Sequence, residues 1–236
     1  INSADDFAEA FNNRGNIFLK LKKYDEALIN YKKTLEINPE YSQAFNNMGN
    51  VYSELKQFKK AKNCFNSAIL INPQYLVALN NLGNCYKDLE QYEEAILTYE
   101  KAIKVNQSFS ESYINLAKVL TIINRFDTAK DYYNKALNIN SVNSTYYSDF
   151  GIYYIKLEKF DEGIDCFKKA IALNQNSYEN YKNLAICYLN KNSFSNAILN
   201  FKKAITINSK SPELFNYLAH TLSKLNNLSE ANLNFK

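Results

Sequence analysis

The chain is poor in the residues that most often carry catalysis or interrupt helices. Its 236 residues include no tryptophan, one histidine, three prolines and five glycines. The lone histidine, His220, has no second imidazole to complete a metal site, and no glycine-rich phosphate loop is present. With so few glycines and prolines, the chain has few sites at which a long loop would interrupt regular structure. We therefore expect no catalytic residue, no metal site and no cofactor, and we predict that the chain is not an enzyme.

Neither charge nor hydropathy indicates a nucleic acid or a membrane as partner. The 28 basic and 24 acidic side chains leave a net charge of +4, which is far from the basic balance of a nucleic-acid-binding domain. No stretch approaches the roughly 20 apolar residues that cross a bilayer. We therefore expect no nucleic-acid binding and no membrane insertion.

The four cysteines have no metal-binding or redox spacing. Cys64, Cys85, Cys166 and Cys187 lie far apart in the sequence and form no C-x-x-C pair, which argues against zinc or redox chemistry. Free thiols pack as small apolar side chains and persist in a reducing compartment. We therefore expect buried cysteines and an intracellular, cytoplasmic protein.

An eight-residue segment recurs every 34 residues along the chain. Its strongest copies are FNNRGNIF at 11–18, FNNMGNVY at 45–52 and LNNLGNCY at 79–86. Weaker copies begin at 113, 147, 181 and 215, without insertion or deletion between the seven. Self-similarity at a fixed period is the signature of a repeat protein. We number the positions of a repeat from 1 to 34, so that this segment occupies positions 4–11.

Each repeat is predicted to form two helices. Apolar residues at positions 4, 7, 8 and 11, and again at 17, 20, 24 and 27, have the spacing of amphipathic helices. Positions 8 and 20 hold only Gly or Ala, which would let two helix backbones approach closely, and position 24 is always aromatic. Position 31 is Asn in all six repeats that reach it. These asparagines are expected to end the second helix in the left-handed conformation.

The predicted repeats cover almost the whole chain as one solenoid domain over 1–236. INSADDFAEAF resembles INPEYSQAF at 37–45, so Ile1 is expected to end the second helix of an earlier repeat. Lys236 is expected to lie inside the second helix of the seventh repeat, so the chain would be a segment of a longer solenoid. The repeats are 8–41, 42–75, 76–109, 110–143, 144–177, 178–211 and the partial 212–236.

The small residue at position 8, the A-x-x-x-F pattern and the closing N-P of Asn38–Pro39 and Asn72–Pro73 resemble the tetratricopeptide repeat. Large apolar residues replace the family's Trp at position 4, where they can pack in the same way. The resemblance implies an all-α fold, a right-handed α-solenoid superhelix. It also implies a concave groove, lined by the first helices, that binds a protein or peptide. The chain is similar in addition to the tetratricopeptide region of the nucleocytoplasmic O-linked N-acetylglucosamine transferases.

Asparagines recur on the first helices at positions 5, 6 and 9, which the predicted core does not use. Each side-chain amide offers both donor and acceptor groups, and a peptide backbone repeats one of each per residue. A file of such amides could therefore grip an extended peptide of almost any sequence, as the resemblance to the glycosyltransferases implies. The predicted peptide-binding residues are Asn12, Asn13, Asn16, Asn46, Asn47, Asn50, Asn80, Asn81, Asn84, Asn115 and Asn183.

Of two other interpretations of these asparagines, composition or packing stays open and a carboxylate clamp is disfavoured. Asparagine is abundant throughout the chain, so the file could reflect composition or packing without any ligand. The family's carboxylate clamp would need cations where this chain has Asn12, Val77 and Asn81, and without them it loses its charge-assisted bonds.

The sequence leaves three functions to be distinguished. The first is a scaffold that binds a protein or peptide in the groove. The second is the substrate-recognition arm of a glycosyltransferase whose catalytic domain lies outside these residues. The third is a self-assembling scaffold, a homo-oligomer formed when open repeat ends stack between copies.

Overall fold

The computed structural model describes residues 3–234 of the chain, and it describes side chains within 5–225. Over this range every regular element is an α-helix, so the predicted all-α class is confirmed. The first helices of the repeats are α1 (Ser3–Lys20), α3 (Ser42–Glu54), α5 (Leu76–Asp88), α7 (Ser110–Ile122), α9 (Ser144–Lys156), α11 (Tyr178–Asn190) and α13 (Pro212–Asn234). The second helices are α2 (Tyr24–Ile37), α4 (Phe58–Ile71), α6 (Tyr92–Val105), α8 (Phe126–Ile139), α10 (Phe160–Leu173) and α12 (Phe194–Ile207).

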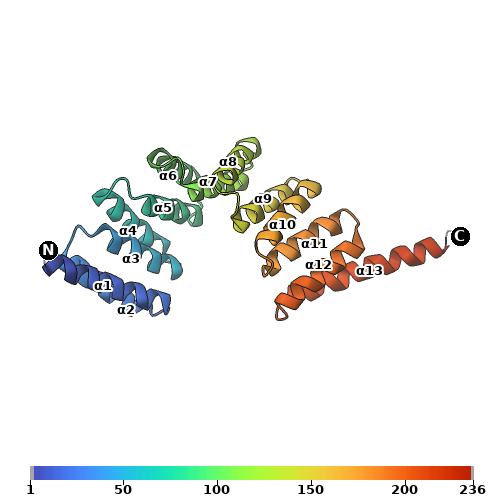
Figure 1. Ribbon diagram of the computed structural model, residues 1–236, viewed down its shortest axis with the longest axis horizontal. Helices are drawn as coiled ribbons and strands as arrows, with labels where there is room; N and C mark the ends of the chain where they lie inside the picture. The colour runs from blue at the N-terminus through green and yellow to red at the C-terminus, as the bar shows by residue number, and fades with distance from the viewer. Residues whose placement is uncertain (1–2, 235–236) are drawn as a thin grey trace. The chain divides into compact units, whose positions relative to one another are not determined.

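The helices fall into two compact units, Ile1–Tyr132 and Tyr133–Lys236. Within each unit the two helices of a repeat pack against each other, and each second helix packs against the first helix of the next repeat (Figure 1). The first helices of successive repeats also touch, as α1 touches α3 and α3 touches α5. This stacking of helix–turn–helix units is that of an α-solenoid. A single domain over 1–236, with the repeat boundaries given above, stays a prediction.

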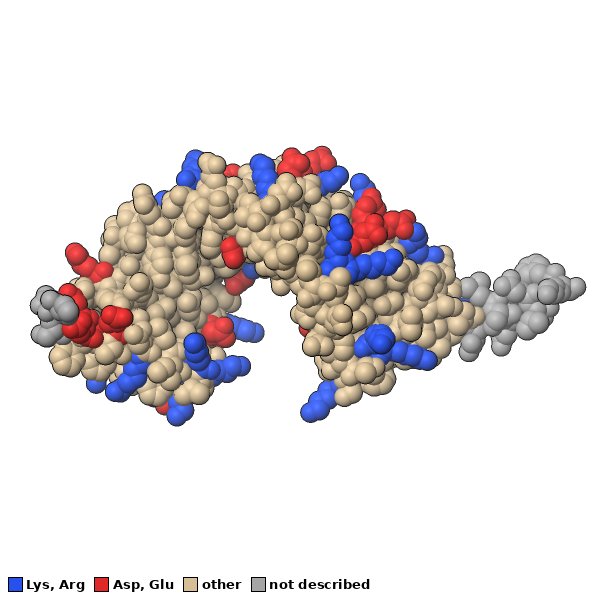
Figure 2. Space-filling model, in the orientation of Figure 1, with Lys and Arg blue, Asp and Glu red and all other residues tan. Residues whose placement is uncertain are grey.

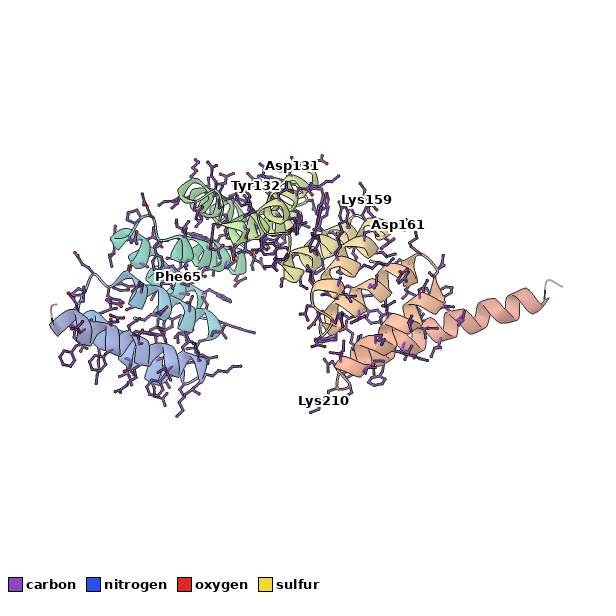
Figure 3. The ribbon with its side chains drawn as sticks, viewed as in Figure 1. Phe65, Asp131, Tyr132, Lys159, Asp161 and Lys210 are labelled. Carbon is purple, nitrogen blue, oxygen red and sulfur yellow. The ribbon has the colours of Figure 1, made fainter. Side chains whose placement is uncertain are left out.

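The core is built by the aromatic ring at position 24 lying against the small residue at position 8. Phe65, labelled in Figure 3, is 1% exposed within the first unit. A Cβ added to Gly49 would lie only 2.4 Å from its Cε1 atom. The small residue therefore makes room for a ring, whereas the sequence suggested a close approach of two backbones. The same contact joins Gly15 to Tyr31, Gly83 to Tyr99 and Gly151 to Phe167.

Position 20 behaves differently, as Gly163 shows. A Cβ added there would lie 3.2 Å from Sγ of Cys187 and 3.6 Å from the backbone oxygen of Gly151. At this position the small residue does bring the two helices of a repeat close to each other.

We expect Gly49→Ala to lower the free energy of unfolding by about 1–3 kcal/mol, because the new methyl group overlaps the buried Phe65 ring. Gly163→Ala is the matched control. Its neighbour is a thiol that can rotate, and alanine favours a helix over glycine by up to about 1 kcal/mol. Urea denaturation of both variants would check this, and equal losses would contradict the ring-on-glycine contact.

The turn inside each of the first six repeats depends on a residue in the left-handed conformation at position 15. In the first repeat the amide of Lys22 (φ 57°) donates to the Leu19 oxygen, and the amide of Lys23 donates to the Phe18 oxygen. This pair of bonds is a Schellman motif, which ends a helix and reverses the chain. The residues that share this conformation are Lys22, Lys56, Glu90, Asn124, Glu158 and Asn192.

The asparagines at position 31 do not adopt the left-handed conformation that the sequence suggested. Asn38 (φ −130°, ψ 95°) and Asn72 (φ −127°, ψ 92°) are extended. Their side chains explain the preference, because Oδ1 of Asn38 accepts the amide of Glu40 at 3.0 Å and Oδ1 of Asn72 accepts that of Gln74 at 3.1 Å. An asparagine that bonds to the backbone two residues later forms an Asx turn. Position 31 is therefore structural, although by a different geometry.

The seventh repeat departs from the predicted helix–turn–helix. Instead of a turn near 225 and a second helix, α13 runs without interruption from Pro212 to Asn234. Ala219, at position 8, is exposed, whereas its counterparts in the other repeats are buried. Within the described residues no aromatic ring packs on Ala219 to offset the cost of a left-handed turn, and a continuous helix keeps its backbone bonds. The expectations for Ile1 and Lys236 lie outside the described residues.

Candidate functional site

The predicted peptide-binding asparagines of the first unit lie on the first helices, where they bond to one another between repeats. Nδ2 of Asn47 donates to Oδ1 of Asn12 at 3.1 Å and to Oδ1 of Asn16 at 2.9 Å. Position 6 of one repeat is thus the donor, and positions 5 and 9 of the preceding repeat are the acceptors. Both hydrogens of the Asn47 amide are committed to this contact.

The same contact recurs one repeat later and in part once more. Nδ2 of Asn81 donates to Oδ1 of Asn46 and of Asn50, each at 3.0 Å. Nδ2 of Asn115 donates to Oδ1 of Asn80 at 3.0 Å. We call these bonds the amide network. It gives the asparagines a role in joining repeats, which is a packing role of the kind that the sequence left open beside the peptide grip.

Tyrosine hydroxyls complete the network in two repeats. Tyr31 donates to Oδ1 of Asn16 at 2.9 Å, and Tyr99 donates to Oδ1 of Asn84 at 2.7 Å. Burial raises the pKa of Tyr31 to about 12 and also raises the pKa of Tyr99. Both hydroxyls therefore keep their proton at neutral pH and can donate.

Sequence reasoning assigned these two tyrosines only to the core and missed their polar contact. The signal was present as an asparagine at position 9 paired with a tyrosine at position 24. The second repeat has Phe65 in place of the tyrosine, so Asn50 accepts from Asn81 alone.

The asparagines of the amide network differ in burial and in which side-chain atoms remain free to bind another group. Asn12 and Asn46, at position 5, are 5% and 3% exposed. Asn16, Asn50 and Asn84, at position 9, are half-buried. Their Oδ1 atoms accept bonds, while among the described residues nothing accepts from their Nδ2 groups. Position 9 therefore presents amide donors in a fixed orientation.

Asn13 and Asn183 lie outside the amide network. Asn13 is exposed on α1 and Asn183 is half-buried on α11, in the second unit. The structure therefore brings together the predicted residues from Asn12 to Asn115, except Asn13, and does not join Asn183 to them.

A surface cavity of about 400 Å³ lies beside the network between the first and second repeats. Asn50 lines it, at the level where α1 and α3 end. The other lining residues are Leu19, Lys20, Lys22, Tyr24, Ser53 and Glu54.

The remaining polar and charged side chains of the described residues form no metal site and, on the face seen in Figure 2, no large patch of one charge sign. No group of three or more His, Cys, Asp or Glu within them is placed to hold a metal ion. Burial raises the pKa of Cys166 to about 11 and that of Cys187 to about 12, so both thiols stay protonated at neutral pH. Basic and acidic side chains are interspersed on the face seen in Figure 2. None of the described helices combines the length and apolarity that a membrane span needs.

Comparison with solved structures shows the same fold in proteins of low sequence identity. A chain of the APC/C hetero-tetramer Cut9–Hcn1 matches with a TM-score of 0.79 and 18% identity, covering 91% of this chain and 43% of that one. This chain thus spans less than half the length of that protein. PilF of Pseudomonas aeruginosa matches with a TM-score of 0.77 and 18% identity, covering 93% of this chain and 100% of that one.

A third structure is that of YrrB, described as a TPR protein with an unusual peptide-binding site. It matches with a TM-score of 0.57 and 22% identity, covering 79% of this chain and 96% of that one. None of the curated proteins matches the chain in sequence.

Comparison with family models bears directly on the repeats. Tetratricopeptide repeat models match residues 8–41, 42–75 and 77–109, then 110–143, and then 148–212. Because these matches cover well over half of its length, the chain belongs to the tetratricopeptide repeat family.

Proposed function

We propose that the first unit binds an extended peptide along α1, α3 and α5, held by the position 9 asparagines. Tetratricopeptide scaffolds are typical of protein–protein interaction, and most of them are not catalysts. The observation that carries the proposal is the set of unused Nδ2 donors on Asn16, Asn50 and Asn84. Their oxygens are occupied, so the bound atoms would be acceptors, the carbonyl oxygens of the ligand backbone.

The repeat spacing suits such a ligand. Packed helices lie roughly 8–10 Å apart, and an extended chain advances about 3.3 Å per residue. One asparagine would then meet a backbone carbonyl about every third ligand residue. Each bond contributes only about 0.5–1.5 kcal/mol net, so affinity would require several repeats acting together. The glycosyltransferase arm and the self-assembling scaffold stay predictions from the sequence.

We expect the triple variant Asn16→Asp, Asn50→Asp, Asn84→Asp to bind peptides at least about 10-fold more weakly, because three donors are lost. An aspartate oxygen can still accept from Tyr31, Asn47, Asn81 and Tyr99, so the amide network survives. The measurement is selection from a random dodecapeptide library displayed on beads, followed by fluorescence anisotropy of the selected peptides.

The matched control adds the same three charges elsewhere in the first unit, through Asn63→Asp, Asn66→Asp and Gln107→Glu, all exposed in the native chain. This control should bind like the native protein. Equal affinity of the triple variant, with unchanged helicity, would show that the position 9 donors hold no ligand.

A further inference from the structure

A second cavity in the first unit is lined by basic side chains and by no acidic one. It measures about 380 Å³ and lies where α4 begins, against the end of α5. Its lining residues are Lys56, Gln57, Phe58, Lys59, Lys60 and Leu89. Three lysines thus border one hollow between the second and third repeats.

These three lysines are not neutralised within the described part of the chain. No carboxylate lies within ion-pair distance of Lys56, Lys59 or Lys60, although ion pairs form elsewhere, as between Arg125 and Glu93 at 2.7 Å. Lys60 lies 5.5 Å from the centre of the Tyr52 ring, which leaves its charge in place. The Schellman turn fixes the backbone of Lys56, because Gln57 donates to the Tyr52 oxygen at 2.8 Å.

The other repeats show that this arrangement is unusual for the chain itself. Positions 18 and 19 are both acidic in α2, α6 and α10, as in Asp25–Glu26, whereas α4 has Lys59–Lys60. The start of a helix carries partial positive charge, so acidic residues there stabilise it and basic residues destabilise it. The second repeat therefore has a less stable helix start than its neighbours, and bound negative charge at the cavity would relieve the repulsion.

We propose that this cavity binds an acidic side chain, Asp or Glu, of the peptide ligand. The inference rests on the proposed function, since α3 of the same repeat carries Asn50, one of its donors. The occupant follows from charge complementarity, because three lysines border the cavity, no acidic residue lines it, and their positive charge favours a negative group. The neighbouring cavity that Asn50 lines also contains Glu54, so we assign the acidic group to the cavity of Lys56, Lys59 and Lys60.

The test compares two bead libraries of random dodecapeptides, one that includes Asp and Glu and one with Asn and Gln in their place. The native chain is expected to select from the first library with strong enrichment of acidic residues. Lys59→Glu with Lys60→Glu, which gives α4 the acidic start of α2, should lower the affinity for those peptides about 10-fold. It should also raise the melting temperature by roughly 2–6 °C.

The control Lys101→Glu with Lys130→Glu changes the net charge equally at exposed positions that do not line this cavity. It should keep the acidic preference. Selected peptides whose binding requires the position 9 asparagines, but which are not enriched in Asp or Glu, would overturn this inference and leave the proposed function standing. So would an enrichment that survives Lys59→Glu with Lys60→Glu. Selection of no peptide above the bead background would overturn the proposed function and this inference together.

Discussion

Replacing Phe65 with alanine is expected to lower the free energy of unfolding by about 3–5 kcal/mol. The ring is 1% exposed and packs in one cluster with Ala61, Leu82 and Cys85. It therefore joins the two helices of the second repeat to the first helix of the third. Its removal would leave a cavity against Gly49, which has no side chain to fill it.

Urea denaturation followed by circular dichroism would measure the loss, and peptide-resolved hydrogen exchange would place it. Because repeats contact only their neighbours, protection should fall in α3–α5 and stay unchanged in α9–α12. Phe7→Ala is the control, since Phe7 is 62% exposed and its truncation should cost well under about 1 kcal/mol. A similar loss in both variants would contradict the assigned core.

A double variant would test the ring-on-glycine contact further. In a Phe65→Leu background the shorter side chain leaves room near position 49. Gly49→Ala should then cost less than it does alone, a coupling that two residues in contact are expected to show.

Asn47→Leu is expected to lower the free energy of unfolding by about 2–3 kcal/mol, because it removes both donors that join the first two repeats. Oδ1 of the buried Asn12 would then have no partner, and an unsatisfied buried acceptor costs about 1–3 kcal/mol. Asn16 would keep only the bond from Tyr31.

Asn13→Leu is the control for this change, because it makes the same substitution at the same repeat position. Asn13 is exposed, and no hydrogen bond engages its side chain within the described residues. The control should change stability by no more than about 0.5 kcal/mol. If both variants lost equally, the asparagines would not join repeats, and their recurrence would be a matter of composition.

These stability experiments and the binding experiments separate two uses of the same amides. Substitution at position 6 breaks the amide network, whereas Asn→Asp at position 9 leaves its acceptors in place. A variant with Asn13, Asn47, Asn81 and Asn115 all changed to Ala would therefore confuse loss of fold with loss of binding. The position 9 variants avoid this difficulty.

The sequence by itself determined the helix–turn–helix repeat, its period and its core. The period of 34 residues, the small residue at position 8 and the aromatic residue at position 24 identified which side chains are buried, because core packing leaves a regular pattern of size and polarity. That pattern predicted that residues such as Tyr31, Phe65 and Phe201 are buried, and all three are.

Tertiary structure alone decided what the asparagines do and where the basic residues gather. An amide can donate, accept or end a helix, and only the neighbour that it meets selects among these. Asn47 meets two oxygens from the preceding repeat, whereas Asn38 meets the backbone of its own turn. Likewise, Lys56 and Lys60 line one cavity because the turn folds the second helix back. α13 continues past the expected turn, although the sequence of the seventh repeat follows the pattern of the others, because local sequence preference by itself does not end a helix.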